Sequence, residues 1–302
     1  MLDRASTFAD PEIVAMLKTS FVPLAIDQAY QRRQKDAEGD FYRKIAGQGP
    51  RKTENFQGTT QGFYIATADG KMLLYNNNRD PQKVRRLMKE KLAAFQSSGL
   101  REQRVTMIEA GKLDPRFNVE PPEGGLVVRV RAKVLDGYEE ASDHWRQLFQ
   151  DAMSRDNLWL SKNEHDSLVR GEIPISVQKR IAMYHLVDNT RGEPPMWREE
   201  EIRHIDLKLK DGRLTGTVRL ATDDRQRGYE AELQGVVETK NGKVVRFDAV
   251  VLGEFWGEGT FTRGAPKGKF PLGISFTLAD GSDIADKVPP QGSRGWVQGY
   301  LR

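Results

Sequence analysis

From Glu201 onwards the sequence alternates between β-patterned runs and tight turns, and this feature constrains the fold more than any other. Apolar residues at every second position surround Asp211-Gly212, and two longer β-rich runs surround Asn241-Gly242. Asp-Gly and Asn-Gly between such runs are strong signals for two-residue hairpin turns. The runs KFPLGISFTLADG (269–281) and GWVQGYL (295–301) could add strands at the edges. The sequence therefore predicts an antiparallel meander that forms a strongly curved sheet or partial barrel.

The region before the meander has one strand pattern and three helical patterns. GLVVRVRAKV (125–134) alternates in the manner of a strand, and helices are expected over 141–153, 161–171 and 176–188. Ser161 with Glu164 fits a capping box at the start of the second helix. We therefore expect residues 126–302 to form an α+β domain, preceded by a Pro- and Gly-rich linker over 111–125 and a separate domain over 1–110.

The N-terminal region mixes helices and strands. Asp10, Pro11 and Glu12 predict a helix start, with an N-cap acceptor, a proline at the first helical position and an acid in the first turn. The apolar run FVPLAI (21–26) predicts a strand, and Pro23 places this strand at a sheet edge because proline lacks a backbone donor. A helix over 28–46, a hairpin over 62–75 and a helix over 80–95 are expected to follow, and the last helix repeats the Asp-Pro start at Asp80.

The expected order is helix, strand, helix, hairpin, helix. With one more strand in front, it resembles the β-α-β-α-β-β-α core of the thioredoxin superfamily. The resemblance is closest to thioredoxin-like domains with the pattern C-x-x-C … E-x-x-F-x-D-P-E-[IV] … N-x-x-F-V-P-[IV]-x-V-D. The matching positions are Phe8, Asp10, Pro11, Glu12, Ile13, Phe21, Val22, Pro23 and Asp27, and ATADGKML (66–73) resembles the family's D-P-D-G-K hairpin. The resemblance covers residues 2–97 and implies an α/β thioredoxin-like domain there. The C-terminal region resembles no family that we can name.

Three departures separate this chain from redox-active members of that family. The chain has no cysteine, and the family's redox pair would fall immediately before Met1. Thr60, Gln61 and Gly62 stand where the family has a proline that contacts substrate. The family's first strand, which lies between the second strand and the hairpin, is also missing. Either residues upstream of Met1 are absent from the sequence, so that the domain is incomplete, or GLVVRVRAKV fills the gap. The first alternative is favoured because Met1 matches an internal position of the family pattern.

Composition restricts the class of protein. The 302 residues are 38% hydrophobic and 30% charged, as in soluble globular chains. No apolar run approaches the roughly 20 residues of a membrane span. The first ten residues lack the apolar core of a signal peptide, so the sequence as given predicts a cytoplasmic protein, whereas an upstream start would leave export open. The net charge is +4 with both signs mixed, and we interpret the basic runs at 31–35 and 83–91 as solvated helix faces rather than a nucleic-acid surface.

Patterns of catalytic and metal-binding residues are weak. The absence of cysteine excludes disulfides, thiolate metal sites and a thiol nucleophile within these residues. His144, His165, His185 and His204 lack the spacing of a zinc helix, and the sequence has neither a Gly-x-Ser-x-Gly elbow nor a phosphate-binding loop. We expect His144 and His165 at the surface and His185 partly buried. The sequence therefore predicts no metal site and no cofactor.

Two polar-aromatic stretches are the candidates for a binding site. The connection 185–197 carries Asp188, Asn189, Arg191, Glu193 and Trp197, and GEFWGEGTFTRG (253–264) sets Glu254, Trp256 and Glu258 at period two. A strand would place the last three on one face, where the indole could stack on a ligand and the carboxylates could accept its hydrogen bonds, with Phe255 turned towards the core. The alternative is that Trp256 closes the end of the barrel and both carboxylates are solvated.

These observations favour a non-redox thioredoxin-fold protein whose C-terminal domain binds a ligand or a partner. The first alternative is a truncated thiol-disulfide oxidoreductase whose Cys motif lies upstream of Met1. The second is a hydrolase that uses the paired carboxylates of the C-terminal domain for acid–base chemistry.

Overall fold

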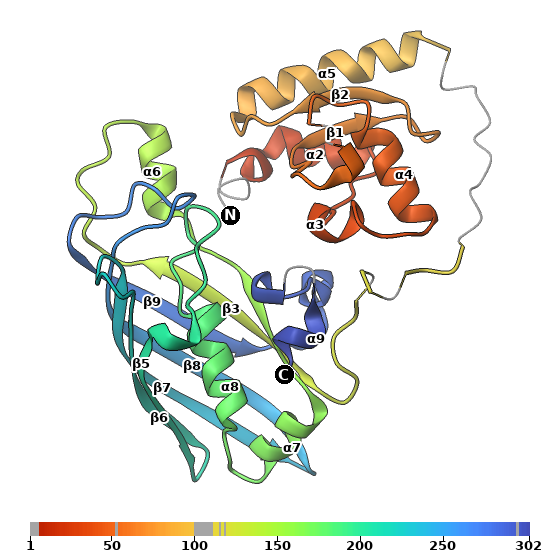
Figure 1. Cartoon of the computed structure of the whole chain (residues 1–302). Helices are drawn as coiled ribbons and strands as arrows, with labels where there is room; N and C mark the ends of the chain where they lie inside the picture. Colours follow the sequence, from red (N-terminus) through yellow and green to blue (C-terminus); the bar gives the residue numbers. More distant parts are fainter. Residues whose placement is uncertain (1–5, 52–53, 100–110, 115, 118, 294–295) are drawn as a thin grey trace. The chain divides into compact units, whose positions relative to one another are not determined.

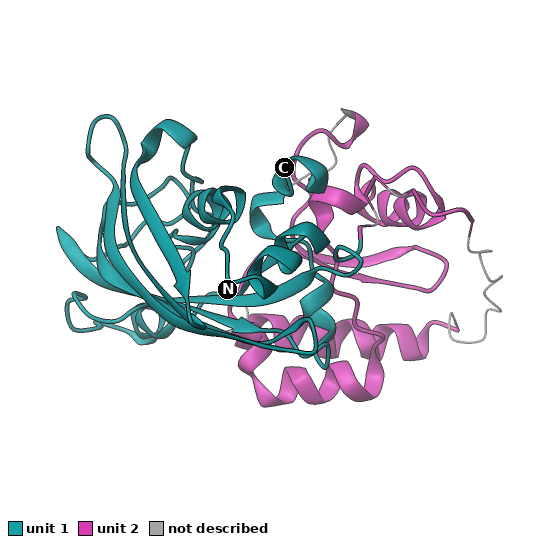
Figure 2. Ribbon diagram, turned by 90° about the horizontal axis from the view of Figure 1, so that it is seen from below, with its two compact units in different colours: residues 1–2, 120–302 teal, residues 3–119 magenta. Residues whose placement is uncertain are grey.

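The computed structural model describes residues 6–51, 54–99, 111–114, 116–117, 119–293 and 296–302. Two compact units divide the chain between Val119 and Glu120, and they are called the N-terminal and C-terminal units below (Figure 2). The N-terminal unit contains η1 (Thr7–Ala9), α2 (Pro11–Ser20), α3 (Gln28–Gln31), α4 (Ala37–Ala46), η2 (Glu54–Phe56), β1 (Phe63–Ala66), β2 (Met72–Asn76) and α5 (Pro81–Ser97).

Two helices of the N-terminal unit begin as their sequences predict. The Asp10 side chain accepts a hydrogen bond from the backbone N–H of Ile13, and Asp80 caps α5 in the same way through Gln82. The helix expected over 28–46 is instead two helices, because Asp36 ends the non-helical stretch between them and caps α4. The Asp36 carboxylate also accepts from the backbone N–H of Asp114 at 2.5 Å, so this residue of the expected linker is attached to the N-terminal unit.

The strand expected at 21–26 does not form. Residues 21–27 lie outside regular secondary structure, and Val22, Leu24 and Ile26 are 86%, 74% and 44% exposed. A strand requires a partner for its backbone groups, and the small sheet of this unit consists of β1 and β2 alone within the described residues. GLVVRVRAKV does not fill the gap, because it forms β3 (Leu126–Val134) of the C-terminal sheet. The N-terminal unit therefore combines helices with a two-stranded sheet, and the chain as a whole is of mixed α/β character.

The C-terminal unit is built around one large sheet. Its elements are β3, α6 (His144–Asp151), β4 (Asp156–Leu160), α7 (Lys162–Val169), α8 (Ile175–Arg180), η4 (Ile181–His185, a π-helix), η5 (Glu199–Glu201), β5 (Ile202–Lys210), β6 (Arg213–Ala221), β7 (Gly228–Lys240), β8 (Lys243–Trp256), β9 (Lys269–Leu278), η6 (Ile284–Lys287), η7 (Gln291–Ser293) and α9 (Val297–Tyr300). The predicted capping box at Ser161 and Glu164 is present at the start of α7.

The sheet is the predicted antiparallel meander. Its seven strands follow the order β4-β3-β9-β8-β7-β6-β5, and the sheet curls into a half-barrel with α7 and α8 against its inner face (Figure 1). Asp211-Gly212 and Asn241-Gly242 have positive φ at both positions, as the tight turns require. Six large aromatic side chains are buried on the inner side of the sheet: Trp197, Tyr229, Phe247, Phe255, Phe270 and Phe276.

Two strand predictions near the C-terminus are wrong in detail. β9 is not an edge, because it lies between β3 and β8 and bonds to both. Residues 297–300, expected in an edge strand, form the short helix α9. The sequence patterns of both segments are local, whereas the position of a strand in a sheet depends on which distant segment pairs with it.

Candidate functional site

The polar residues of the 188–197 connection lie mostly inside the C-terminal unit. Asp188 and Arg191 are buried and form an ion pair, and Arg191 donates further hydrogen bonds to the hydroxyl of Tyr138 at 2.6 Å and to the carbonyl of Thr262 at 3.2 Å. Burial raises the pKa of Tyr138, so its hydroxyl stays neutral and accepts the Arg191 bond. Arg191 thus joins the 188–197 connection to the segments that contain Tyr138 and Thr262. In this conformation Asp188 and Arg191 stabilise the unit and do not face solvent.

Trp197 and Asn189 are also buried, whereas Glu193 is exposed. The Trp197 indole N–H donates to the carbonyl of Leu186 at 2.7 Å, and the guanidinium of Arg227 lies 3.9 Å from the ring centre. Burial lowers the pKa of Arg227, although the carboxylate of Glu201 acts against that change. Trp197 is thus a core residue whose polar atom is satisfied by backbone.

Two of the three predicted residues of the second stretch share the outer face of the sheet, which is the face opposite α7 and α8. Glu254 is exposed and Trp256 is half-buried on β8, while Phe255 between them is buried in the core as predicted. Glu258 lies beyond the end of β8, and its carboxylate accepts from the backbone N–H groups of Gly264 and Ala265 at 2.8 and 3.1 Å. The Glu258 side chain therefore stabilises the loop over 258–265 by hydrogen bonds within that loop.

Trp256 belongs to a charged cluster formed with Glu230, Glu254 and Lys269, called the outer-face cluster below. The Lys269 ammonium lies 2.9 Å from Glu230, 3.6 Å from Glu254 and 4.8 Å from the centre of the indole. The hydrogen bond to Glu230 raises the pKa of Lys269 and keeps it charged. The indole lies across Gly228, where an added Cβ would come within 2.0 Å of the ring, and its N–H donates to the carbonyl of Arg225 at 3.0 Å.

An apolar stripe continues the same face. Val250 and Leu252 precede Glu254 and Trp256 at period two on β8, and they are 51% and 52% exposed. Leu252 lies opposite Gly273 on β9, and the side chain of Leu135, itself 52% exposed, covers that glycine. Leu135, Val250 and Leu252 are called the outer apolar stripe below. Half-exposed aliphatic side chains grouped in this way are characteristic of contact surfaces.

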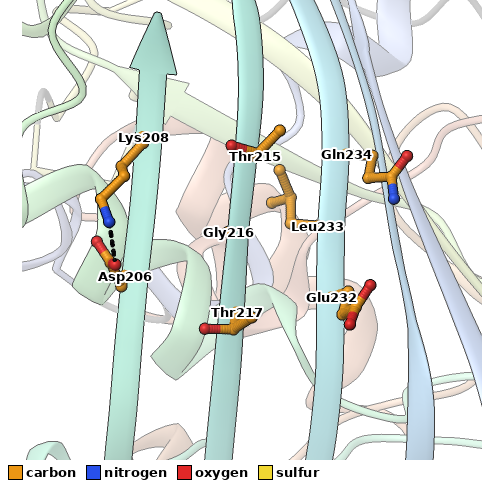
Figure 3. Close-up of a pocket in the computed structure, with 8 residues that line it drawn as sticks. All are labelled: Asp206, Lys208, Thr215, Gly216, Thr217, Glu232, Leu233 and Gln234. Atoms are coloured by element: carbon orange, nitrogen blue, oxygen red, sulfur yellow. Dashed lines mark ion pairs between the residues drawn. The ribbon is translucent and has the colours of Figure 1, made fainter.

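A shallow polar depression of about 360 Å³ lies beside the stripe on the same face (Figure 3). The pairing register places Thr217 opposite Glu232, and Glu232 opposite Leu252, so the depression and the stripe are adjacent. The lining residues are Asp206, Lys208, Thr215, Gly216, Thr217, Glu232, Leu233 and Gln234, and an ion pair of 2.7 Å joins Asp206 to Lys208. No motif in the sequence predicts this depression, because its lining residues come from β5, β6 and β7 and only the sheet brings them together.

A second polar group is buried beneath the C-terminal helix. The Tyr300 hydroxyl and His185 Nε2 are 2.6 Å apart, and His185 Nδ1 lies 3.2 Å from a carboxylate oxygen of Asp156. Burial raises the pKa of Tyr300 well above its usual range and keeps its hydroxyl neutral. All three side chains are buried. The order of groups resembles a catalytic triad, but a buried neutral tyrosine is not a nucleophile, and we assign this group to holding α9 in place.

His165 is buried, and the prediction that it lies at the surface is wrong. Its Nε2 accepts the backbone N–H of Val244 at 3.1 Å, and its Nδ1 is 3.0 Å from the carbonyl of Gly124. These contacts require the neutral imidazole with the proton on Nδ1. His165 thus joins α7 to the start of β8, which no local pattern in the sequence could indicate.

Among the described residues, no cluster of three His, Asp or Glu side chains could hold a metal ion, and no helix is long and apolar enough to cross a membrane. Comparisons with family models, with curated proteins and with solved structures found no match for this chain. Any functional assignment therefore depends on the geometry described above.

Proposed function

We propose that this protein is a non-enzymatic binding protein: a thioredoxin-like module without redox thiols, joined to a C-terminal unit that binds a partner protein through the outer face of its sheet. The N-terminal proposal is supported by the helix, hairpin and helix order and by the Asp-Pro helix starts of α2 and α5. Without a cysteine, the chain as given has no group that can form a mixed disulfide.

The observation that carries the C-terminal proposal is the outer apolar stripe, which lies on the same face of β8 as Trp256. Most of the outer face is polar, as a solvated sheet should be, yet three aliphatic residues lie together on it, and Trp256 follows them on β8 with Glu254 between. Protein interfaces combine such an apolar centre containing aromatic anchors with a polar rim. Glu230, Glu254 and Lys269 on one side, and the polar depression on the other, supply that rim.

The same contacts are unfavourable for a carboxylate-dependent hydrolase. Acid–base hydrolysis needs two carboxyl groups in different environments, one of which is kept protonated by an apolar site. The two carboxylates of that hypothesis, Glu254 and Glu258, are both exposed; Glu254 lies 3.6 Å from Lys269, and Glu258 accepts two backbone N–H groups of its own loop. Neither carboxylate therefore lies in the apolar site that a general acid of this kind requires.

Site-specific photocrosslinking tests the proposed partner surface. A photoreactive amino acid is placed at Leu252, and in a control protein at Arg170, an exposed residue of the C-terminal unit just after α7. Expressed in the source cells, the Leu252 protein should give a discrete adduct that disappears when Leu135 and Val250 are both changed to serine. Adducts of equal yield at both positions, or a Leu252 adduct unaffected by the serine changes, would contradict the proposal.

A further inference from the structure

Two rows of side chains cross the outer face of the large sheet through the outer apolar stripe. In each row, every residue lies opposite the next one on the neighbouring strand, in the order β3, β9, β8, β7, β6 and β5. The first row is Lys133, Gly273, Leu252, Glu232, Thr217 and Asp206. The second row is Arg131, Ser275, Val250, Gln234, Thr215 and Lys208. Both rows therefore have an aliphatic residue on β8 and polar residues on either side of it.

The two sides of the stripe carry opposite charges that have no counter-charge of their own. Arg131 and Lys133 lie on β3, two strands to one side of β8, and Glu232 lies on β7, one strand to the other side. Within the described part of the chain, none of these three side chains forms an ion pair, and the Lys133 ammonium donates only to the carbonyl of Asp151, at 3.2 Å. Lys133 and Glu232 are three strand spacings apart, about 14 Å, so they cannot pair within one chain.

We propose that the partner of the outer face is a second copy of this chain, packed sheet against sheet about a twofold axis that runs along β8. This inference rests on the proposed function, since it names the partner for the same surface. An interface between identical copies must be complementary to itself, because both copies contribute the same patch. An apolar centre on the axis, with cations on one side and an anion on the other, meets that requirement.

The register of the rows predicts which residues meet. A twofold axis along β8 keeps each row at its own level and exchanges its two sides, so Leu252 meets Leu252 of the second copy. β3 and β6 are each two strands from β8, so β3 of one copy comes to lie over β6 of the other. Lys133 therefore stands over Thr217 of the second copy, one strand spacing from Glu232. The two charges that lack partners within one chain thus become neighbours across the interface.

The polar depression suits the same arrangement. Thr215, Thr217 and Glu232 line it, and all three are exposed on the outer face (Figure 3). Packed sheets lie about 10 Å apart, a gap that long side chains can cross. Arg131 and Lys133 are both long, and in the twofold arrangement they face the depression of the second copy, where hydroxyl groups and a carboxylate can accept their hydrogen bonds.

Other occupants fit this pattern less well. A lipid surface or a nucleic acid attracts cations alone, whereas Glu230, Glu232 and Glu254 place exposed anions on the same face. A different protein would need an apolar centre and both charges in the mirrored order. The experiment below distinguishes that case from a second copy.

Sedimentation velocity of the full chain, at protein concentrations from about 1 to about 100 μM, tests the inference. The unchanged protein should be a reversible dimer. Leu252→Asp should raise the dissociation constant of the dimer at least about tenfold, because it places two charges in the apolar centre. Ile284→Asp is the matched control, since Ile284 is an exposed aliphatic residue of the same unit, 85% exposed against 52% for Leu252. It should dimerise as the unchanged protein does, and circular dichroism should show both variants folded.

Reversal of the charges tests the predicted contact itself. Lys133→Glu and Glu232→Lys should each weaken the dimer, because each places like charges opposite one another. The double variant should recover most of the affinity, because it restores an ion pair across the interface. Since the two residues are about 14 Å apart within one chain, such recovery requires contact between copies.

Three outcomes overturn the inference: a chain that stays monomeric over the whole concentration range, a dimer that Leu252→Asp leaves unchanged, or charge variants that the double change does not rescue. A monomer whose photoreactive group at Leu252 still captures a different protein refutes only the second copy as partner. A monomer that gives no adduct at Leu252 contradicts the proposed function as well.

Discussion

At the scale of single residues, the buried pair of Glu164 and Arg180 makes the clearest prediction. The carboxylate lies 2.8 Å from the guanidinium and also accepts from Ser161 N–H and from the Ser176 hydroxyl. Burial acts to raise the pKa of Glu164, but these partners outweigh it and lower the pKa. Glu164→Gln leaves Arg180 buried without its counter-charge, so we expect a loss of about 3–5 kcal/mol in the free energy of unfolding, measured by urea denaturation at neutral pH.

The same ion pair makes the free energy of unfolding depend on pH. A carboxyl whose pKa is lowered by folding stabilises the protein above its unfolded value of 4.5, and this contribution is lost as the pH falls through the lower folded value. Glu164→Gln should therefore flatten the acid side of the stability curve. Asp166→Asn on the same helix is the control, because Asp166 pairs with Lys162 at the surface and should change stability by less than about 1 kcal/mol. If both substitutions lowered the free energy of unfolding equally, the predicted contribution of the buried ion pair would be contradicted.

Trp256 and Phe255 give a matched comparison of outer and inner faces. Phe255 is buried among Trp197, Tyr229 and Phe270, so Phe255→Ala should cost about 3–5 kcal/mol of unfolding free energy. Trp256 is half-buried, and its loss removes one hydrogen bond and part of its packing, so we expect Trp256→Ala to cost less than about 2 kcal/mol. The melting temperatures of the two variants, measured against that of the unchanged protein, test this difference. A loss at Trp256 as large as that at Phe255 would make the indole structural and remove it from the proposed partner surface.

At the scale of elements, the longest hairpin of the sheet depends on its turn. Asn241 and Gly242 join β7 to β8 with φ of 51° and 71°, and no heavy atom lies within 4 Å of the place where a Cβ on Gly242 would be. Gly242→Ala therefore has only the conformational cost of a left-handed backbone, about 1–2 kcal/mol, which urea denaturation can measure. Lys240→Ala, an exposed change one residue before the turn, should cost less than about 0.5 kcal/mol. A Gly242→Ala variant as stable as Lys240→Ala would contradict the assigned turn.

At the scale of the whole molecule, the two units should separate on limited proteolysis. The backbone N–H of Asp114 donates a hydrogen bond to the carboxylate of Asp36, and the ring of Phe117 packs on that of Tyr30. The expected linker is therefore attached to the N-terminal unit as far as residue 117. Gly125 N–H donates to Pro122, within the C-terminal unit. We expect subtilisin to cut between these anchors and to leave a folded fragment that starts near residue 122, because all seven strands of the large sheet lie beyond that point. Degradation without a stable C-terminal fragment, judged by mass spectrometry, would contradict the independence of that unit.

The sequence by itself determined the features that depend on neighbouring residues. Asp10 and Asp80 cap their helices, Ser161 and Glu164 form the capping box, and Asn241-Gly242 turns the chain, because each needs only a few adjacent residues to satisfy its hydrogen bonds or its backbone angles. Period-two alternation also placed Phe255 inside and Trp256 outside, since successive residues of a strand face opposite sides of the sheet.

Only the tertiary structure decided what depends on distant partners. The polar 188–197 connection was expected to line a binding site, but Tyr138 and Thr262, far away in the sequence, enclose Arg191. His165 is buried because Val244 and Gly124 supply its hydrogen bonds, and residues 22–26 have a strand pattern without a strand because no described segment pairs with them. A side chain or a backbone group is buried or exposed according to what packs against it, and that partner is not encoded in the residue's own neighbourhood.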